Sequence, residues 1–298
     1  MHNSIVKNTM NQYRLLFEDY LSSTATKRSE GVPTKLFESM EYSLNAKGKR
    51  LRPILCLAVA ERCGCKPQNA LPMALGLEML HTATLIHDDL PCMDNDDMRR
   101  GKLSNHKKFG ETLAVLAGDA LLAQSIEYPL LNLKKIETER IIHAMQVFTS
   151  AIGPSGVCGG QVLDMDTSNI DKIPNYVRKI AELKTGALIS ASVVSGAILG
   201  TDDKLIIDCY KNYGLHLGSA FQIVDDILDV TSTAKELGKT QGKDFEQEKI
   251  THVSVYGLET ARKMANEEST LAKKSISKLF KLNDFLLELP DYLIYRTN

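Results

Sequence analysis

The hydrophobic and polar positions follow a helical period along most of the chain. Apolar residues recur at spacings of three and four, which is typical of α-helices with a buried face, and no clear run alternates as a β-strand would. The breaks between these segments are short and contain clusters of Gly and Pro, so we expect no interdomain linker. We predict a single all-α domain over residues 1–298, with about ten helices. The predicted helical segments are 11–21, 34–44, 53–62, 71–87, 112–131, 138–152, 176–199, 204–230 and 253–280.

Composition places the chain among globular proteins with little net charge. Of the 298 residues, 43% are hydrophobic, and 36 Lys and Arg nearly balance 37 Asp and Glu. This balance gives no overall field that would attract nucleic acid or an anionic membrane, so we expect neither as a partner. The first thirty residues are polar and mixed in charge, and six scattered cysteines fit reduced thiols. We therefore expect a cytoplasmic protein.

One uncharged run could be mistaken for a membrane span. Residues 185–201 carry no charge and contain the small pair Gly196 and Gly200. The run is slightly short for a spanning helix, is rich in Ser and Gly, and has charged residues on both sides. We predict a buried central helix that does not span a membrane.

Two acidic motifs carry the candidate chemistry. The first, DDLPCMD, places Asp88 and Asp89 just before Asp94, and Pro91 disturbs the helix so that Asp94 can turn back towards Asp88. In the second, FQIVDDILDV, the i to i+4 spacing puts the first and third aspartates on one helix face. Each motif alone is compatible with a solvated acidic loop or a polar stripe at a helix end. Two unit charges ~4 Å apart repel by roughly 4 kcal/mol at an effective dielectric near 20, so a cation is expected between them.

Oxygen-only carboxylate rows that face one another suit Mg²⁺, which keeps several waters and is readily shared with substrate phosphates. Basic residues that could hold diphosphate accompany both rows. Arg99 and Arg100 follow the first row, residues 238–244 follow the second, and residues 46–53 form a third basic segment. The combination predicts a metal-dependent diphosphate site.

The motifs together resemble the short-chain trans-prenyl diphosphate synthases, the farnesyl and geranylgeranyl diphosphate synthases. The resemblance rests on GKRLRP, HTATLIHDD, DDLPCMD followed by RRG, LKTG, FQ before DDILD, and GKTQGKD, which occur in this order over residues 48–251. It implies an antiparallel helical bundle of the isoprenoid synthase type around a deep central cavity, and a homodimer. The implied activity is Mg²⁺-dependent head-to-tail condensation of isopentenyl diphosphate with the allylic dimethylallyl, geranyl and farnesyl diphosphates.

The resemblance also implies roles for individual residues. The implied Mg²⁺ ligands, for three ions with substrate bound and with Mn²⁺ as an alternative, are Asp88, Asp89, Asp94, Asp225, Asp226 and Asp229. The allylic diphosphate would be held by Arg99, Lys184, Lys239 and Lys243, with oxygens of Thr185 and Gln222 facing the developing allylic cation. Isopentenyl diphosphate, which binds without metal in this family, would be held by Gly48, Lys49, Arg52, His81 and Arg100. Lys47 departs from the family pattern because it replaces the first glycine of GGKR, which puts the conformation of that loop in question.

Product length depends on the depth of the cavity. Helical spacing puts Ala83 and Thr84 about one turn before Asp88, with Met79 and Leu80 deeper. Farnesyl synthases of this type resemble one another in carrying an aromatic residue at the position of Ala83. The small residue here favours a C20 geranylgeranyl product, with a C15 farnesyl product kept open. The hydroxyl of Thr84 has an alternative use, a hydrogen bond to a carbonyl one turn earlier.

Two other classes of protein share part of this pattern. A terpene cyclase would carry a similar first acidic motif but usually an NSE-type second motif, and it would not need the GKRLRP segment. A noncatalytic partner subunit of a heteromeric synthase would tend to lose acidic residues, and both acidic rows are complete here.

Overall fold

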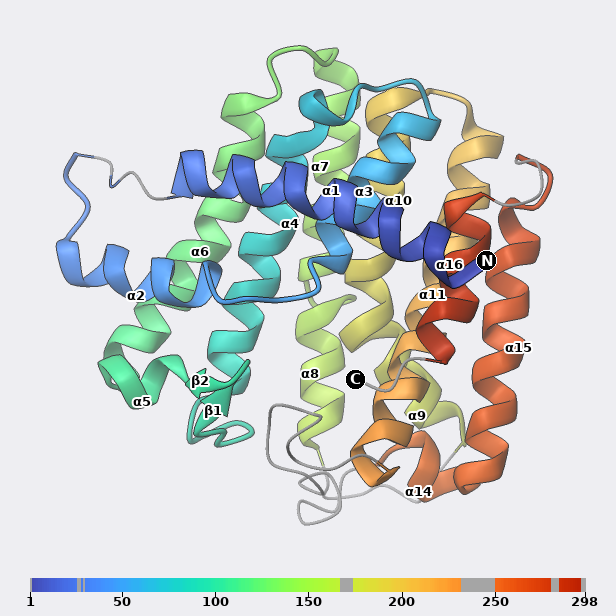
Figure 1. The fold of residues 1–298 in the computed structure, drawn as a ribbon. Coiled ribbons are helices and arrows are strands. Elements are labelled where there is room, and N and C mark those ends of the chain that lie inside the picture. The colour runs from blue at the N-terminus through green and yellow to red at the C-terminus, as the bar shows by residue number, and fades with distance from the viewer. Residues whose placement is uncertain are drawn as a thin grey trace.

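The computed structural model of the chain describes residues 2–25, 28, 30–166, 174–231, 250–279 and 284–295, and its architecture is the predicted helical bundle (Figure 1). The helices are α1 (His2–Ala25), α2 (Thr34–Leu44), α3 (Leu51–Arg62), α4 (Pro67–Asp88), α5 (Asn105–Phe109), α6 (Glu111–Asn132), α7 (Thr138–Ile152), α8 (Val157–Met165), α9 (Pro174–Ile180), the π-helix η1 (Ala181–Gly186), α10 (Ala187–Gly200), α11 (Lys204–Thr231), α14 (His252–Tyr256), α15 (Leu258–Ile276) and α16 (Phe285–Ile294). A hairpin of β1 (Met98–Arg99) and β2 (Lys102–Leu103) completes the described elements.

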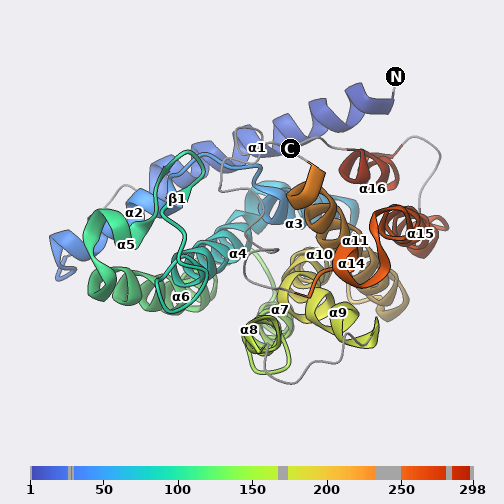
Figure 2. The same ribbon diagram turned by 90° about the horizontal axis from the view of Figure 1, so that it is seen from below.

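The uncharged run identified in the sequence forms α10 at the centre of the bundle. Residues 188–199 are all buried, and α10 packs on α3, α7 and α11 (Figure 2). A methyl group at Gly196 would lie 2.4 Å from the carbonyl oxygen of Cys56, so glycine lets α10 approach the backbone of α3 closely. Within the described residues, one helical stretch, Asn175–Gly200, is long and apolar enough to cross a membrane, and 78% of its apolar 18-residue window is buried inside the protein. The expectation of a core helix is therefore confirmed.

The β-hairpin is an element that the hydrophobic pattern did not predict. Its two strands pair antiparallel, with Met98 opposite Leu103 and Arg99 opposite Lys102. The two residues between them, Arg100 and Gly101, both have positive φ, of 53° and 75°. Positive φ at both central positions is the requirement of a type I′ turn. Gly101 adopts it readily, whereas Arg100 adopts it as a non-glycine residue. Strands of two residues are too short to display any alternation.

Elements from distant parts of the sequence meet at one end of the bundle. Figure 1 shows the hairpin and α14 at the same end, with α1 lying across the side of the bundle. α11 packs along α10 and α15, and α4 packs along α6 and α3. The carboxyl end of α4, where the first acidic motif begins, lies at this end of the bundle, near the hairpin.

Candidate functional site

One cavity of about 620 Å³ gathers most of the residues that the sequence singled out. Its walls come from the segment before α3, from α4, α8, η1 and α11, and from residues 94–100 and 250–252. The predicted site residues on these walls are Gly48, Lys49, Arg52, His81, Thr84, Asp88, Asp94, Arg99, Arg100, Lys184, Thr185, Gln222, Asp225 and Asp226. The walls do not include Met79, Leu80, Ala83, Asp89 or Asp229. Lys239 and Lys243 lie outside the described residues.

The chain folds back on itself directly after α4, which brings Asp94 to Asp88. The backbone N–H of Asp94 donates to the carbonyl oxygen of Asp88 at 2.8 Å, and Asn95 has a left-handed conformation with φ of 50°. Burial raises the pKa of Asp88 to about 6; the charge of Lys184 opposes this shift and that of Asp94 adds to it. A divalent cation beside Asp88 would relieve this electrostatic cost.

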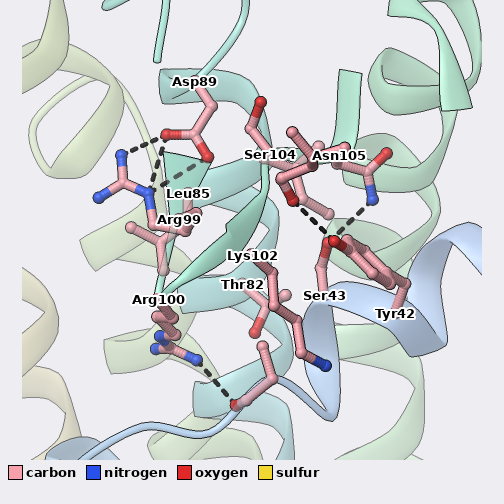
Figure 3. A pocket seen from close by; sticks show the side chains of 13 residues that line it. Tyr42, Ser43, Thr82, Leu85, Asp89, Arg99, Arg100, Lys102, Ser104 and Asn105 are labelled. Carbon is pink, nitrogen blue, oxygen red and sulfur yellow. Dashed lines mark hydrogen bonds and ion pairs between the residues drawn. The ribbon is translucent and has the colours of Figure 1, made fainter. Parts of the chain in front are cut away.

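Asp89 points to the other side of this turn, where it binds Arg99 of the hairpin. Its carboxylate is 2% exposed and accepts hydrogen bonds from Arg99 Nε at 2.9 and 3.2 Å and from Arg99 Nη2. Arg99 also pairs with Asp96 at 3.2 Å. Figure 3 shows this contact at the edge of a second, small pocket behind the hairpin, in which Arg100 Nη1 donates to the carbonyl oxygen of Ala46 at 3.3 Å. Asp89 thus holds Arg99 in place beside the cavity.

The second acidic motif presents its three aspartates differently. Asp225 is exposed on the cavity wall, and Asp229 is buried outside that wall. Asp226 is 5% exposed, and both of its oxygens accept hydrogen bonds from protein groups. Oδ1 accepts from Gln222 Nε2 at 2.8 Å, and Oδ2 accepts from the backbone N–H and Nδ1 of His252 at 2.8 and 2.7 Å. No local pattern in the sequence indicated His252, because its role depends on the placement of α14 against α11.

The acidic residues fit a hard divalent cation that is shared with a substrate. Asp88, Asp94 and Asp225 offer only oxygen donors, the type that Mg²⁺ prefers. In the part of the chain that the structure describes, no group of three or more His, Cys, Asp and Glu side chains is arranged to hold a metal by itself. Mg²⁺ commonly uses one or two carboxylates and takes its remaining ligands from water and phosphate. The donor set is therefore suited to a metal bound together with a diphosphate.

A cationic wall stands next to the acidic residues. Burial, the largest effect, lowers the pKa of the Arg52 guanidinium to about 10, and Arg100 adds to this shift while Glu78 opposes it. Burial followed by the charges of Arg52 and Arg100 also lowers the pKa of His81 well below its ordinary value. Among the described residues, Arg52 Nε has no hydrogen-bond partner. A wall of half-buried cations with an unsatisfied donor is suited to bind an anion.

An ion-pair network that sequence reasoning missed supports this wall. Arg50 is 2% exposed; its Nη1 donates to Glu78 Oε1 at 2.6 Å, its Nε to Glu18 Oε1 at 2.8 Å, and its Nη2 to the carbonyl oxygen of Leu44 at 3.0 Å. Glu78 is 1% exposed, and Arg100 Nη2 lies 3.9 Å from its Oε1. The signal for this network in the sequence was a single Glu, Glu78, inside the apolar run of α4.

The loop before α3 accommodates Lys47 without strain. The non-glycine residues with positive φ in the described chain are Arg50, Asn95 and Arg100, so Lys47 does not need the conformational freedom of a glycine. Gly48 matters for a different reason, since a methyl group there would lie 2.9 Å from Cζ of Arg100. The left-handed residue is Arg50, with φ of 51°, at the start of α3.

The π-helix η1 carries Lys184 and Thr185 to the cavity. It is held on two sides by glycines, since a methyl group at Gly160 of α8 would lie 2.2 Å from the backbone nitrogen of Lys184, and one at Gly218 of α11 would lie 2.5 Å from Cα of Gly186. Lys184 Nζ donates to Asp164 Oδ2 at 2.5 Å. A π-turn within an α-helix is often found at a functional site. Asp164 is a further residue that the sequence analysis did not single out.

The residues that the sequence associated with product length divide between two faces of α4. Thr84 lines the cavity, and its hydroxyl donates to the carbonyl oxygen of His81 at 2.8 Å. Ala83 is 1% exposed and shares a helix face with Gly76 and His87, which closely approach α6. Met79 and Leu80 are also buried. Thr84 therefore presents its side chain to the described cavity, whereas Ala83 faces α6.

Comparisons with known proteins agree with this geometry. The model of the family described as polyprenyl synthetase matches residues 33–283. The chain is 45% identical over 289 residues to a dimethylallyltranstransferase of Fischerella ambigua, covering 96% of this chain and 82% of the relative. It is 43% identical over 268 residues to a chloroplastic geranylgeranyl pyrophosphate synthase of Catharanthus roseus, covering 89% and 75%. The structure of a Helicobacter pylori geranyltransferase complexed with magnesium and isoprenyl diphosphate is similar with a TM-score of 0.83 and 31% identity, covering 98% of this chain and 96% of that one.

Proposed function

Because the chain belongs to the polyprenyl synthetase family and is a trans-prenyltransferase, we propose that it catalyses the Mg²⁺-dependent head-to-tail condensation of isopentenyl diphosphate with allylic diphosphates. The observation that carries this proposal is the division of one cavity into an acidic part and a cationic part. Asp88, Asp94 and Asp225 line the acidic part. Lys49 and Arg52 line the cationic part. One diphosphate would bind through metal, and the other directly to side chains.

The residues around the acidic part have complementary roles in this reaction. Bound Mg²⁺ would neutralise the allylic diphosphate and favour its departure from the allylic carbon. Arg99, held by Asp89, and Lys184, held by Asp164, would bind the diphosphate oxygens. Apolar wall residues such as Leu85 and Phe221 would exclude water from the cation that forms.

The cationic part would hold isopentenyl diphosphate with its double bond towards the allylic carbon. The double bond attacks that carbon, and loss of one proton to the departed diphosphate gives a product five carbons longer. Arg52 and Arg100 would supply forked donors, and Lys49 a point charge. The lowered pKa of His81 favours a neutral imidazole, which can donate one hydrogen bond to a diphosphate oxygen without adding charge.

This arrangement supports chain elongation over the other two classes that the sequence left open. A terpene cyclase has no need of a second, metal-free diphosphate site. The half-buried Arg52 and Arg100 are best explained by such a site. A noncatalytic subunit has no need of the complete acidic rows, and the chain is a transferase by its family.

Turnover with defined substrates tests the proposal. The purified chain is incubated with Mg²⁺, labelled isopentenyl diphosphate and dimethylallyl, geranyl or farnesyl diphosphate, and the products are separated by length. We expect Mg²⁺-dependent elongation in steps of five carbons, which chelation of the metal stops. Absence of any elongated product from a folded, Mg²⁺-loaded protein would refute the proposed function.

We propose geranylgeranyl diphosphate, C20, as the main product. The support is the small side chain of Thr84 on the cavity wall one turn below Asp88, together with the similarity to a geranylgeranyl pyrophosphate synthase. Farnesyl diphosphate, C15, is the alternative product.

Replacing Thr84 with Phe should shorten the product to C15 or below, because the larger ring would occupy the space that the growing chain enters. The first condensation should survive, since the change lies below the diphosphate site. Chromatography of the dephosphorylated products measures this shift. Ala83→Ser is the matched control, because Ala83 faces α6, and it should leave the product length unchanged. An unaltered product distribution in the Thr84→Phe variant would place the end of the cavity elsewhere.

We propose that the enzyme is a homodimer formed through α6. Several large apolar side chains of this helix are exposed, among them Leu116 at 52% and Leu130 at 51%, and they lie on one side of it. Exposed apolar side chains gathered on one helix are typical of a surface that another chain covers. Sedimentation velocity should give the mass of two chains, and a monomer at micromolar concentration would contradict this.

The cytoplasmic location stays a prediction, which the six free thiols support.

A further inference from the structure

A directed chain of hydrogen bonds runs from α14 through α11 to η1 at the cavity wall. His252 donates to Asp226 Oδ2 through its backbone N–H at 2.8 Å and contacts it through Nδ1 at 2.7 Å. Gln222 Nε2 donates to Asp226 Oδ1 at 2.8 Å. Thr185 Oγ1 donates to Gln222 Oε1 at 2.5 Å. All four residues line the cavity, and Asp226, His252 and Thr185 are at least nine-tenths buried.

The chemistry of Asp226 fixes the direction of the whole chain. A carboxylate only accepts hydrogen bonds, so the Gln222 side chain must turn its NH₂ group towards Asp226 and its oxygen towards Thr185. The single hydroxyl proton of Thr185 is then used in the bond to Gln222. The remaining lone pairs on the Thr185 oxygen are left for the cavity. Asp226 therefore determines that the lone pairs of the Thr185 oxygen, and not its hydroxyl proton, face the cavity at this point.

Asp226 is poorly suited to be a metal ligand while it makes these contacts. Its Oδ2 already interacts with two nitrogens of His252, and its Oδ1 with Gln222. Asp225, the preceding residue, is the one that is exposed on the cavity wall. Adjacent residues on a helix point about 100° apart, so the two carboxylates serve different surroundings.

We propose that Asp226 is a positioning residue, which fixes the orientation of the Gln222 amide and thereby the electrostatic polarity of the cavity wall at Thr185, instead of binding Mg²⁺. The proposal rests on the proposed function, in which an allylic cation develops in this cavity. Preorganised dipoles aimed at a developing charge lower the barrier without any cost of reorientation during the reaction. His252 contributes by holding the carboxylate in the rotamer that presents Oδ1 to Gln222.

The isosteric change Asp226→Asn reverses the polarity of the chain. The asparagine oxygen would stay with the two donors of His252, so its NH₂ group would face Gln222. The Gln222 amide must then turn over, present its NH₂ group to Thr185, and send the Thr185 hydroxyl proton into the cavity. A partial positive charge next to a developing cation raises the barrier to reaction.

Steady-state kinetics of wild type, Asp226→Asn and the matched variant Asp225→Asn test the proposal. For Asp226→Asn we expect kcat to fall by about a hundredfold, the size of effect seen when one preorganised dipole is lost. Its KM values for both diphosphates and its half-saturating Mg²⁺ concentration should stay as in wild type. Asp225→Asn should instead raise the half-saturating Mg²⁺ concentration. In a Gln222→Leu background, adding Asp226→Asn should lower kcat little further, because Asp226 acts through the Gln222 amide that this background lacks.

Two outcomes overturn the proposal. The first is a raised Mg²⁺ requirement in Asp226→Asn, with kcat restored at saturating Mg²⁺, which would make Asp226 a ligand. The second is wild-type kcat in that variant. If circular dichroism shows that Asp226→Asn is unfolded, the proposal is tested with His252→Phe and His252→Asn instead. The Phe variant lacks the Nδ1 donor, and the Asn variant restores a donor close to its position. A loss of kcat in His252→Phe that His252→Asn recovers supports the proposal, and equal kcat in all three proteins overturns it. An inactive wild type would refute the proposed function instead.

Discussion

Replacing Asp88 with Asn should lower kcat by roughly three orders of magnitude while the helical bundle stays folded. The loss is large because metal stabilisation of the departing diphosphate, worth several kcal/mol, depends on this carboxylate. The fold should not suffer, because burial already raises the pKa of Asp88 to about 6 and the neutral amide removes a charge that is costly to bury. Turnover at saturating substrate and the melting temperature from circular dichroism measure the two effects.

Asp208→Asn is the matched control for this experiment. Asp208 is exposed on α11 and does not line the cavity, so both its turnover and its melting temperature should equal those of wild type. Near-normal turnover of folded Asp88→Asn would contradict a role for the first acidic motif in metal binding.

Replacing Arg50 with Met should reduce the free energy of unfolding by about 3–5 kcal/mol, the usual cost of leaving one partner of a buried ion pair unpaired. Glu78 would keep its charge at 1% exposure, and the carbonyl oxygen of Leu44 would lose its donor. The double variant Arg50→Met/Glu78→Leu should recover part of this loss, because it removes a buried carboxylate that has lost its closest partner. Urea denaturation followed by circular dichroism measures the difference.

An exposed ion pair provides the comparison for Arg50. Arg140 pairs with Asp202, whose side chain is 69% exposed, so Arg140→Met should cost about 1 kcal/mol or less. If Arg50→Met cost no more than Arg140→Met, the buried network around Glu78 would not stabilise the fold as we infer.

The helices and the acidic motifs were predictable because they depend on local spacing. Each of the nine segments predicted from the 3.6-residue period contains helix in the described residues, although segment 253–280 divides at Gly257 into α14 and α15, and the shorter helices α5, α8 and α16 were missed. The proline after Asp88 indicated the turn that returns Asp94. The hairpin was missed because its strands have two residues each. The π-helix was missed because close glycine contacts between helices hold it, which no local pattern reports.

Within the site, spacing identified which residues come together but not which partner each one takes. Asp89 and Asp226 belong to acidic motifs, yet their oxygens are used by Arg99 and His252, residues that tertiary packing brings to them. For α4, helix geometry itself favours Thr84 over Ala83. Thr84 lies four residues before Asp88 and close to its face, whereas Ala83, five residues before, points about 140° away.

The π-helix η1 has a consequence for how changes in chain length act on this enzyme. A π-turn is equivalent to one residue inserted into an α-helix. Deleting a single residue within Ala181–Gly186 would remove the extra residue of the π-turn and let α9 and α10 join as one regular helix, while both helices keep their faces. The side chains inside the stretch, Lys184 and Thr185 among them, would then change direction relative to the cavity even though every remaining residue type is retained. Insertions and deletions in this stretch therefore change the chemistry of the site, whereas those in surface loops alter only the length of a connection.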